Sequence, residues 1–372
     1  MKLRLAVLGA LLVLAAPALA AAPSVGGRAY VVLNGGTGEV LLKRDAREQL
    51  PIASITKLMT VLVTLEHAKP SDVVTVSRYA ASVGESTINL VPGEQLTVRE
   101  LVQAALIQSA NDAATALAYH VGRGDLGAFV ELMNRKARQL GLEDTHFVNP
   151  DGLDEYGHYS SALDVTKLAR VAMRKPIIRA IVRQTDAYIS GGRHLRTWND
   201  LLSTFPNLLG IKTGHTSGAG WSQVAAARGR GVTIYATLLG EPTRQQRNSD
   251  LATLLAWGIA RYRVVPVIQP QRVYASADVP FGRRDLTLVA TKRMLRVVRI
   301  DRALVERVVA PAVVSLPVER GQPLGEVRVY AGKKLIAREP LVAARSISRP
   351  GLLGRAGWHA GQTAHHVWSL VS

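Results

Sequence analysis

The sequence predicts an α+β fold followed by a smaller all-β domain. Three observations support this prediction. Strand-like alternation occurs at both ends of the first domain, helical periodicity fills the stretch between, and from Val264 the chain turns into short β-like pieces split by Pro and Gly. Strands that come first and last in a domain are expected to pair in one antiparallel sheet, with helices packed in layers against it.

The first domain, expected over residues 24–262, begins with a β-hairpin. Residues 28–46, RAYVVLNGGTGEVLLKRDA, alternate apolar and polar side chains on both sides of a glycine-rich turn. The other predicted elements follow in chain order: helices at 54–67, 97–108, 111–121, 126–141 and 161–174, strands at 221–228 and 232–240, and a helix at 247–262. Thr97 and Glu100 form a capping-box pattern at the start of the second helix.

The second domain, expected over residues 264–346, contains only strand signals. Valine, leucine and other strand-forming residues recur in short runs, with turn residues between them. The runs lie at 271–275, 286–290, 295–300 and 325–343.

The N-terminal 20 residues are predicted to be an export signal. Lys2 and Arg4 precede an apolar run that ends in Ala18-Leu19-Ala20, a pattern that signal peptidase accepts. The run is shorter than the ~20 residues that a spanning helix needs, which favours cleavage over an uncleaved anchor. The mature protein is therefore expected outside the cytoplasm.

The tail, residues 347–372, is predicted to be an amphipathic membrane anchor. If it is helical, Leu353, Ala360 and Val367 lie on one face, while Arg355 and His366 lie on the other. A frayed terminus is the alternative, because the tail contains four glycines.

Composition excludes several kinds of chemistry. The 372 residues include no cysteine, so disulfides, thiol catalysis and cysteine-bound zinc are ruled out. No histidine pattern indicates a metal site, and no cofactor is expected. The net charge is +18, and residues 261–349 alone contain 18 Lys or Arg against 7 Asp or Glu. In an exported chain without a nucleic-acid-binding motif, this surplus indicates a basic surface and no nucleic-acid partner.

Three short motifs carry the candidate chemistry. Ser54 lies three residues before Lys57 in IASITKLMT, so both side chains share one face of a helix. Further along come Ser109-Ala110-Asn111 and Lys212-Thr213-Gly214. A lone Ser-x-x-Lys pair is weak evidence, but the three motifs in this order are the signature of penicillin-binding proteins and class A β-lactamases.

The sequence around these motifs resembles that of one subfamily, the low-molecular-weight penicillin-binding proteins that act as D-alanyl-D-alanine carboxypeptidases. The similar stretches, within residues 27–345, are PIASITKLMT, GEQLTVRELVQAALIQSANDAATALA, THFVNPDGLD, YSSALDVTKLAR and GIKTGHTSGAGW. The resemblance implies a β-lactamase-like transpeptidase domain. It also implies peptidoglycan stem peptides as substrates, β-lactams as inhibitors, and a place at the periplasmic face of the bacterial inner membrane, bound through the C-terminal helix.

The resemblance also implies roles for individual residues. Ser54 would be the nucleophile, activated by a buried, neutral Lys57. Ser109 would relay a proton to the leaving amine, and Asn111 would bind a substrate amide. The substrate's free carboxylate would be matched by Lys212, Thr213 and Arg247, with Gly214 leaving room for the peptide, and an oxyanion hole would be formed by the backbone N–H groups of Ser54 and His215.

Simpler structural roles stay open for some of these residues. Ser109 and Asn111 could merely cap the helix at 111–121, Lys57 could be a lysine whose amine reaches solvent, and Arg247 could be an exposed helix-start arginine. The chain also departs from its relatives at TWNDLL, where Trp198 stands in a segment that usually reads Asn-Arg-Asn or Asn-Thr-Asn. This difference bears on the preference for substrate side chains.

Three other functions remain as alternatives. A β-lactamase would need a general base in Glu-x-x-Leu-Asn, and ELMN at Glu131–Asn134 is one residue short of that pattern. A DD-endopeptidase acting on cross-links would use the same motifs. A non-catalytic envelope scaffold is disfavoured by the intact motif set.

Overall fold

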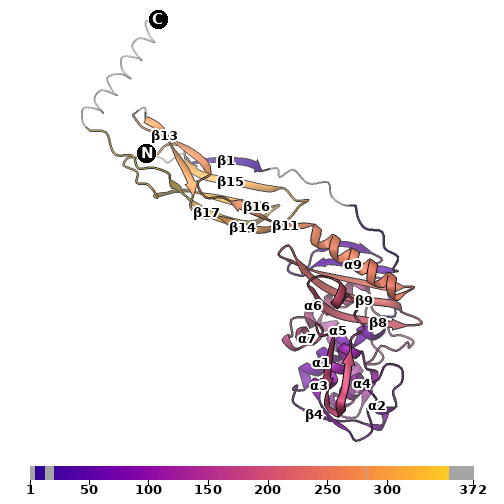
Figure 1. Cartoon of the computed structure of the whole chain (residues 1–372). Helices are drawn as coiled ribbons and strands as arrows, with labels where there is room; N and C mark the ends of the chain where they lie inside the picture. Colours follow the sequence, from indigo (N-terminus) through magenta and orange to yellow (C-terminus); the bar gives the residue numbers. More distant parts are fainter. Residues whose placement is uncertain (1–4, 13–20, 282, 352–372) are drawn as a thin grey trace. The chain divides into compact units, whose positions relative to one another are not determined.

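The structure is a computed structural model of the chain, and it describes residues 5–12, 21–281 and 283–351 (Figure 1). The chain forms two compact units. One is Ala20–Ala260, and the other comprises Arg261–Ser372 together with Met1–Leu19. Each unit has its own cluster of buried apolar side chains, so each has its own core.

The larger unit is built on a five-stranded antiparallel sheet in the order β3-β2-β10-β9-β8. The predicted hairpin is present as β2 and β3, and β2 also pairs with β10 from the far end of the unit. Strands from both ends therefore share one sheet, which confirms the expected α+β arrangement. The strands are β2 (Ala29–Asn34), β3 (Val40–Arg44), β8 (Leu208–Thr216), β9 (Gly220–Gly229) and β10 (Val232–Glu241), with two small ladders of β4 (Val73–Thr75) with β5 (Gln95–Thr97) and β6 (Asp186–Ile189) with β7 (Arg193–Arg196).

Helices cover both faces of this sheet, since successive side chains of a strand point to opposite faces. On β10, Ile234 faces Gly258 of α9, whereas Thr237 on the other face hydrogen-bonds Thr166 of α6 at 2.6 Å. The helices are α1 (Lys57–His67), α2 (Arg78–Ser82), α3 (Val98–Gln103), α4 (Asn111–Val121), α5 (Leu126–Gln139), α6 (Ala162–Ala172), α7 (Pro176–Ile181), α8 (Leu201–Thr204) and α9 (Arg244–Ala260), with a short 3-10 turn η3 (Ser190–Gly192).

Two predicted helices have irregular ends. The helix expected over 54–67 begins as a 3-10 turn, η1 (Ala53–Thr56), and α1 starts only at Lys57. The helix expected over 97–108 has the predicted capping box but changes after α3 into a π-helical turn, η2 (Ala104–Gln108). Such turns are frequent at functional sites. The sequence pattern predicted the helical periodicity but not these local changes, because both depend on tertiary contacts.

Strand β8, which contains Lys212-Thr213-Gly214, is absent from the predicted elements. Its sequence, LLGIKTGHT, includes two glycines and no sustained alternation, so the pattern is weak. Pairing with β9 along Lys212–Thr216 nevertheless makes it an edge strand of the sheet. Tertiary pairing therefore supplies what local propensity does not.

The smaller unit is all-β, as predicted. Its six-stranded sheet has the order β1-β15-β16-β17-β13-β12, and β11 pairs separately with β14. The strands are β11 (Tyr262–Ile268), β12 (Val273–Val279), β13 (Arg283–Ala290), β14 (Met294–Arg299), β15 (Leu304–Pro311), β16 (Pro323–Ala331) and β17 (Lys334–Ala343).

The ends of the chain are described only in part. Within the predicted signal peptide, β1 (Leu5–Leu12) pairs antiparallel with β15. If the first 20 residues are removed, β15 becomes an edge strand. The predicted amphipathic helix falls on residues 352–372, which lie outside the described ranges. In the described part of the chain, no helix has both the length and the apolar character to cross a membrane.

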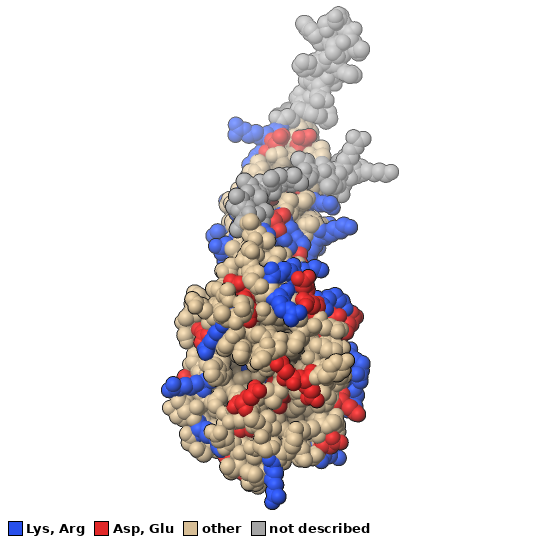
Figure 2. Space-filling view, turned by 90° about the vertical axis from the view of Figure 1, so that its right-hand side faces the viewer, with Lys and Arg blue, Asp and Glu red and all other residues tan. Residues whose placement is uncertain are grey.

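The basic surplus of residues 261–349 is visible at the surface of the smaller unit. Lys292 and Arg293 follow β13, and Lys333 and Lys334 lie at the β16–β17 turn; all four are exposed. Figure 2 shows Lys and Arg side chains on both units, with Asp and Glu among them.

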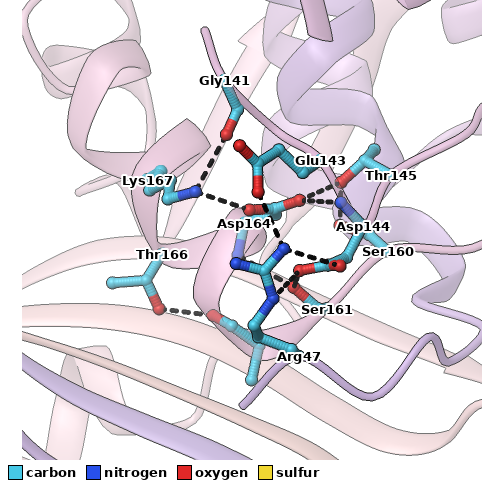
Figure 3. Close-up of polar contacts among 11 residues, drawn as sticks. Arg47, Gly141, Glu143, Asp144, Thr145, Ser160, Ser161, Asp164, Thr166 and Lys167 are labelled. Atoms are coloured by element: carbon cyan, nitrogen blue, oxygen red, sulfur yellow. Dashed lines mark hydrogen bonds and ion pairs between the residues drawn. The ribbon is translucent and has the colours of Figure 1, made fainter. Parts of the chain in front are cut away.

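A polar network anchors the segment that leads to Ser54 (Figure 3). Arg47 donates to Glu143 at 2.8 Å and to Asp144. The fully buried Asp164 accepts bonds from the Asp144 backbone N–H at 2.7 Å and from Lys167 at 2.9 Å. Backbone bonds between Leu50 and Ser160 in both directions extend this connection. The turn that carries Ser54 is therefore attached on its N-terminal side to the start of α6.

Gly152 is expected to be indispensable for the position of this turn. Its φ is +88°, and a Cβ added there would lie 2.0 Å from the carbonyl oxygen of Ala53. Gly152→Ala should therefore lower the free energy of unfolding by at least about 2 kcal/mol, measured by urea denaturation. Gly36→Ala is the control, because its nearest neighbour, a side-chain oxygen, is 3.4 Å away; it should cost less than about 1 kcal/mol. Equal stability of the two variants would contradict this account.

Candidate active site

Ser54 and Lys57 lie in contact. Lys57 Nζ is 2.7 Å from Ser54 Oγ. The lysine is completely buried, while Ser54 is partly exposed and lines a cavity. A molecule in the cavity can thus reach the hydroxyl, with the amine directly behind it, and Lys57 is not a lysine whose amine extends to solvent.

Burial sets the protonation of Lys57. Loss of water lowers the pKa of its amine to about 8, and the negative charges of Asp151 and Asp112 oppose this shift. Nζ also lies 2.6 Å from Asn111 Oδ1 and 2.8 Å from the Asp151 carbonyl oxygen. A neutral amine has two N–H donors for these oxygens, and its lone pair can accept the hydrogen bond of the Ser54 hydroxyl. The arrangement suits a base that removes the serine proton.

The Ser-Ala-Asn motif supplies two side chains to the same cavity. Ser109 ends the π-helical turn with a φ of 68°, and Asn111 is the first residue of α4. The N-cap of α4 is Ala110, without a side-chain cap, so the alternative that these two side chains merely cap the helix is wrong. Asn111 Nδ2 donates to the Gly84 carbonyl at 3.0 Å, which orients its oxygen toward Lys57.

Lys212 approaches from the opposite wall, on edge strand β8. Its amine donates to Ser109 Oγ at 2.7 Å and to the Thr213 carbonyl oxygen at 3.0 Å. Burial, with repulsion from Lys57 and Arg247, holds the pKa of Lys212 well below its usual value. Two buried amines on different elements are therefore each bonded to a serine hydroxyl of the cavity lining.

Gly214 allows a close approach of two segments of the chain. A Cβ at this position would lie 2.6 Å from the Ile52 carbonyl oxygen and 3.1 Å from Ala53 Cβ. The glycine therefore lets β8 approach the turn that carries Ser54. The expected role, leaving room for a peptide, stays a prediction, and Gly214 is part of the cavity lining. Thr213 and His215 on either side of it line the cavity.

Arg247 and His215 lie at one part of the cavity lining, around Trp221. The His215 ring packs against Trp221 with centroids 4.0 Å apart, and Arg247 lies over the same indole at 5.7 Å. Arg247 is buried, so it is not an exposed helix-start arginine. Burial lowers the pKa of its guanidinium to about 10, which leaves it charged at neutral pH, and Asp200 accepts a bond from it at 3.3 Å.

Several residues of the site lie outside the three motifs that carry the candidate chemistry. Asp151 supplies the carbonyl oxygen for Lys57, and Gly152 next to it packs against Ala53. Buried His158 bonds Thr56 Oγ1 at 2.8 Å and accepts from the Val148 N–H, and burial lowers its pKa to about 4, so it is neutral. Only the Asn-Pro-Asp-Gly turn sequence before Leu153 hinted at this loop.

The cavity brings together most of the residues predicted from sequence. Of the nine, Lys57 and Lys212 stand behind its surface, bonded to serines in its lining. The described ranges contain no group of three or more His, Asp or Glu side chains suited to a metal ion. The lining is Ser54, Glu85, Ser86, Ser109, Asn111, Gly152, Leu153, Trp198, Thr213, Gly214, His215, Thr216, Trp221 and Arg247.

Solved structures share this fold. Penicillin-binding protein 5 from Haemophilus influenzae is 26% identical in sequence, with a TM-score of 0.65, over 89% of this chain and 100% of that one. A DD-transpeptidase from Streptomyces is 29% identical with a TM-score of 0.61, over 64% of this chain and 98% of that one. The first of these likenesses extends through both units, and the second covers a smaller share of the chain.

Sequence comparisons find relatives of the same kind as the solved structures. A D-alanyl-D-alanine carboxypeptidase of Escherichia coli, DacC, is 32% identical over 365 residues, covering 93% of this chain and 90% of that protein. DacF of Bacillus subtilis, of the same description, is 30% identical over 339 residues, or 88% of this chain and 87% of that protein. The family model described as D-alanyl-D-alanine carboxypeptidase matches residues 16–243. The chain belongs to the D-alanyl-D-alanine carboxypeptidase family of serine peptidases.

Proposed function

We propose that this protein removes the terminal D-alanine from peptidoglycan stem pentapeptides through an acyl-enzyme on Ser54. The observation that carries the proposal is the contact between Ser54 Oγ and the fully buried amine of Lys57, at 2.7 Å. A hydroxyl with its own base can attack a peptide carbonyl without a metal or a cofactor. Family membership supports the substrate class.

In the acylation step, neutral Lys57 takes the proton from Ser54 as Oγ bonds to the carbonyl carbon of the penultimate D-Ala. The C–N bond then breaks, and the proton taken up by Lys57 passes through Ser109 to the leaving amine of the terminal D-Ala, which returns Lys57 to its neutral form. The backbone N–H groups of Ser54 and His215 are proposed to stabilise the oxyanion. Water then hydrolyses the ester, with Lys57 again acting as base, and restores free Ser54.

Substrate orientation is assigned to the charged residues of the cavity. Arg247, charged and held by Asp200, is proposed to bind the carboxylate of the terminal D-Ala together with Thr213 and Lys212. Asn111 is proposed to bind the amide on the acyl side of Ser54. The peptide would then lie along edge strand β8, beside Gly214.

β-Lactams are proposed to acylate the same serine, as is typical of this family. A β-lactamase function fits less well, because Glu131 lies on the exposed side of α5, paired with Arg135, and Asn134 bonds the Phe147 backbone. Neither residue is in the cavity lining. A DD-endopeptidase remains the second enzymatic candidate, and a non-catalytic scaffold is disfavoured by the assembled Ser54–Lys57 pair.

We also propose the cellular setting. Residues 1–20 would direct export, residues 24–262 would form the catalytic domain, and residues 264–346 would form the β domain. The tail, residues 347–372, would hold the enzyme peripherally at the periplasmic face of the inner membrane. Support comes from the signal-peptide pattern and the amphipathic periodicity of the tail.

The reaction is tested by release of free D-alanine from a pentapeptide that ends in D-Ala-D-Ala. We expect release by the wild-type protein and a loss of at least roughly 10³-fold in Ser54→Ala, because the nucleophile is missing. Prior treatment with penicillin should abolish release. If folded wild-type protein forms a penicillin adduct on Ser54 but cleaves only a cross-linked peptide dimer, the endopeptidase alternative holds instead. If no adduct forms and no D-alanine is released, the protein is a non-catalytic scaffold.

The pH dependence of acylation tests the role of Lys57. Because the neutral amine is the active form and its pKa is about 8, the rate of penicillin acylation should rise about tenfold from pH 6 to pH 7 and level off above pH 8. Lys57→Arg should remove most acylation at every pH, since a guanidinium keeps its proton. A flat profile in the wild-type protein between pH 6 and 8 would contradict a lysine base.

The membrane proposal is tested with protein that ends at Gly351. Full-length mature protein should sediment with vesicles of mixed neutral and anionic phospholipid, whereas the shortened protein should remain in the supernatant and still release D-alanine. Equal sedimentation of both proteins would assign any lipid binding to another surface, such as the basic β domain.

A further inference from the structure

Asp154 holds two segments of the active-site region together. Its Oδ1 accepts a hydrogen bond from Thr216 Oγ1 at 2.6 Å, and its Oδ2 accepts one from the Gly218 N–H at 2.9 Å. Thr216 is the last residue of β8, and Gly218 lies in the turn that follows. Leu153, the neighbour of Asp154, lines the cavity together with Thr216. Both oxygens of the carboxylate are therefore used to fasten the end of β8 to the loop that carries Asp154.

The loop that carries Asp154, residues 149–154, has a fixed shape and is named the bridging loop. Asn149 Oδ1 accepts from the Gly152 N–H at 2.8 Å, and Asn149 Nδ2 donates to the Leu153 carbonyl at 3.0 Å. Asp151 Oδ1 accepts from the Leu153 N–H at 3.0 Å. Side chains that bond nearby backbone groups in this way are typical of ordered turns. A restraint on Asp154 is therefore a restraint on the whole loop.

The bridging loop also contacts the residues around the nucleophile. The Asp151 carbonyl oxygen accepts from Lys57 Nζ at 2.8 Å. Gly152 packs so closely against Ala53, the residue before Ser54, that an added Cβ would lie 2.0 Å from the Ala53 carbonyl oxygen. The loop is thus attached to the base and to the turn of the nucleophile, and Asp154 attaches it to β8.

The segment that Asp154 fastens includes a proposed part of the oxyanion hole. His215, whose backbone N–H is assigned to that hole, directly precedes Thr216. β8 is an edge strand, so its end is paired with β9 on one side only. The ends of edge strands are among the parts of a sheet that open most readily. An oxyanion donor, in contrast, must stay within a few tenths of an ångström of its required position.

The exposure of Asp154 separates a local role from a role in overall stability. The side chain is exposed, and hydrogen bonds that water can replace contribute little to the free energy of unfolding. Asp154 is also not among the residues that line the cavity, so a bound ligand is not expected to touch it. The property that its two bonds control most directly is the position of the end of β8 relative to the bridging loop.

We propose that Asp154 is a positioning residue for the acylation of Ser54. It fastens Thr216 and Gly218 to the bridging loop, and so it holds the His215 N–H in place relative to the Ser54–Lys57 pair. This inference rests on the proposed acyl-enzyme mechanism and adds to it a residue outside the three motifs. Because the effect is on the geometry of the oxyanion hole, loss of Asp154 should slow acylation without weakening the initial binding of a ligand.

The first test measures acylation of Ser54 by a fluorescent penicillin in the full mature protein, resolved into a dissociation constant for the initial complex and a rate constant for acylation. Asp154→Ala should lower the rate constant roughly tenfold or more, since a misplaced catalytic group can cost up to roughly 10²-fold. The dissociation constant should change less than about twofold. An unchanged rate constant would overturn the proposal, and so would an effect confined to the dissociation constant.

The pH profile of the same variant separates the oxyanion hole from the base. Asp154 is not among the acidic groups that set the pKa of Lys57, which are Asp151, Asp112 and Glu85. The midpoint of the acylation profile should therefore be the same in Asp154→Ala and in the wild-type protein, with a lower plateau in the variant. A shifted midpoint would show that Asp154 acts on the base, and it would contradict the proposed role.

A double-mutant cycle tests whether Asp154 acts through Thr216. Thr216→Val removes the hydroxyl and should slow acylation in the wild-type background, whereas Thr216→Ser keeps the hydroxyl and should retain most of the rate. In the Asp154→Ala background, Thr216→Val should have no further effect, because its partner is already missing. Effects that multiply would mean that Thr216 acts on the ligand directly, from its place in the cavity lining, and would overturn the proposal.

Asp125→Ala is the matched control. Asp125 Oδ1 also accepts two hydrogen bonds, from the Gly127 N–H at 2.8 Å and the Ala128 N–H at 3.2 Å, but it caps α5 outside the cavity lining. This variant should lose stability through the missing cap and keep both acylation constants of the wild-type protein. Slower acylation in Asp125→Ala would mean that general destabilisation is enough to explain the effect of Asp154→Ala.

Failure of the proposed function can be told apart from failure of this inference. If penicillin labels Ser54 but no D-alanine is released, the carboxypeptidase proposal fails, and the role of Asp154 is still decided by the labelling rates. If the wild-type protein is not labelled at all, the acyl-enzyme mechanism fails and the inference fails with it. If the wild-type protein is active and Asp154→Ala is labelled equally fast, only the inference fails.

Discussion

The side chain of Lys57 is fully removed from water, and its amine hydrogen-bonds oxygens of Ser54, Asn111 and Asp151. Burial of an ammonium group is costly unless it is paired or loses its proton. Here the nearby acidic groups, Asp151 and Asp112, favour the charged form and offset part of that cost, so the pKa of Lys57 is lowered only to about 8. A lysine that is readily deprotonated is thus a consequence of where α1 begins, at the centre of the unit's core.

The surrounding residues exclude water from Lys57 and hold its amine within hydrogen-bond distance of Ser54. Gly152 and Gly214 allow a loop and a strand to approach the Ala53–Ser54 turn more closely than any side chain would permit. On its N-terminal side the turn is tied to the start of α6 by the Leu50–Ser160 bonds. These contacts hold the turn in place while Ser54 stays partly exposed in the cavity lining, so that a modest nucleophile is preorganised there.

Charge in the cavity is distributed unevenly along the proposed peptide path. Arg247 makes one part positive, as a carboxylate ligand requires, and it remains charged because Asp200 offsets part of the effect of its burial. Glu85, the acidic residue of the lining, lies in a loop whose neighbouring carbonyls, of Gly84 and Ser86, accept hydrogen bonds from Asn111.

Much of this protein was determined by sequence alone. The α+β order, the hairpin of β2 and β3, helices α4–α6 and the all-β second unit follow from periodicity and turn residues, and three motifs identify the Ser54, Ser109 and Lys212 segments. Only tertiary structure decided the remainder. Strand β8 has too little alternation to be predicted and exists because β9 pairs with it. The π-helical turn before Ser109 and the roles of Asp151, Gly152 and Gly214 depend on contacts between residues far apart in the chain. Local patterns record propensity and spacing, whereas burial, close approach and pKa shifts arise only when distant segments pack together.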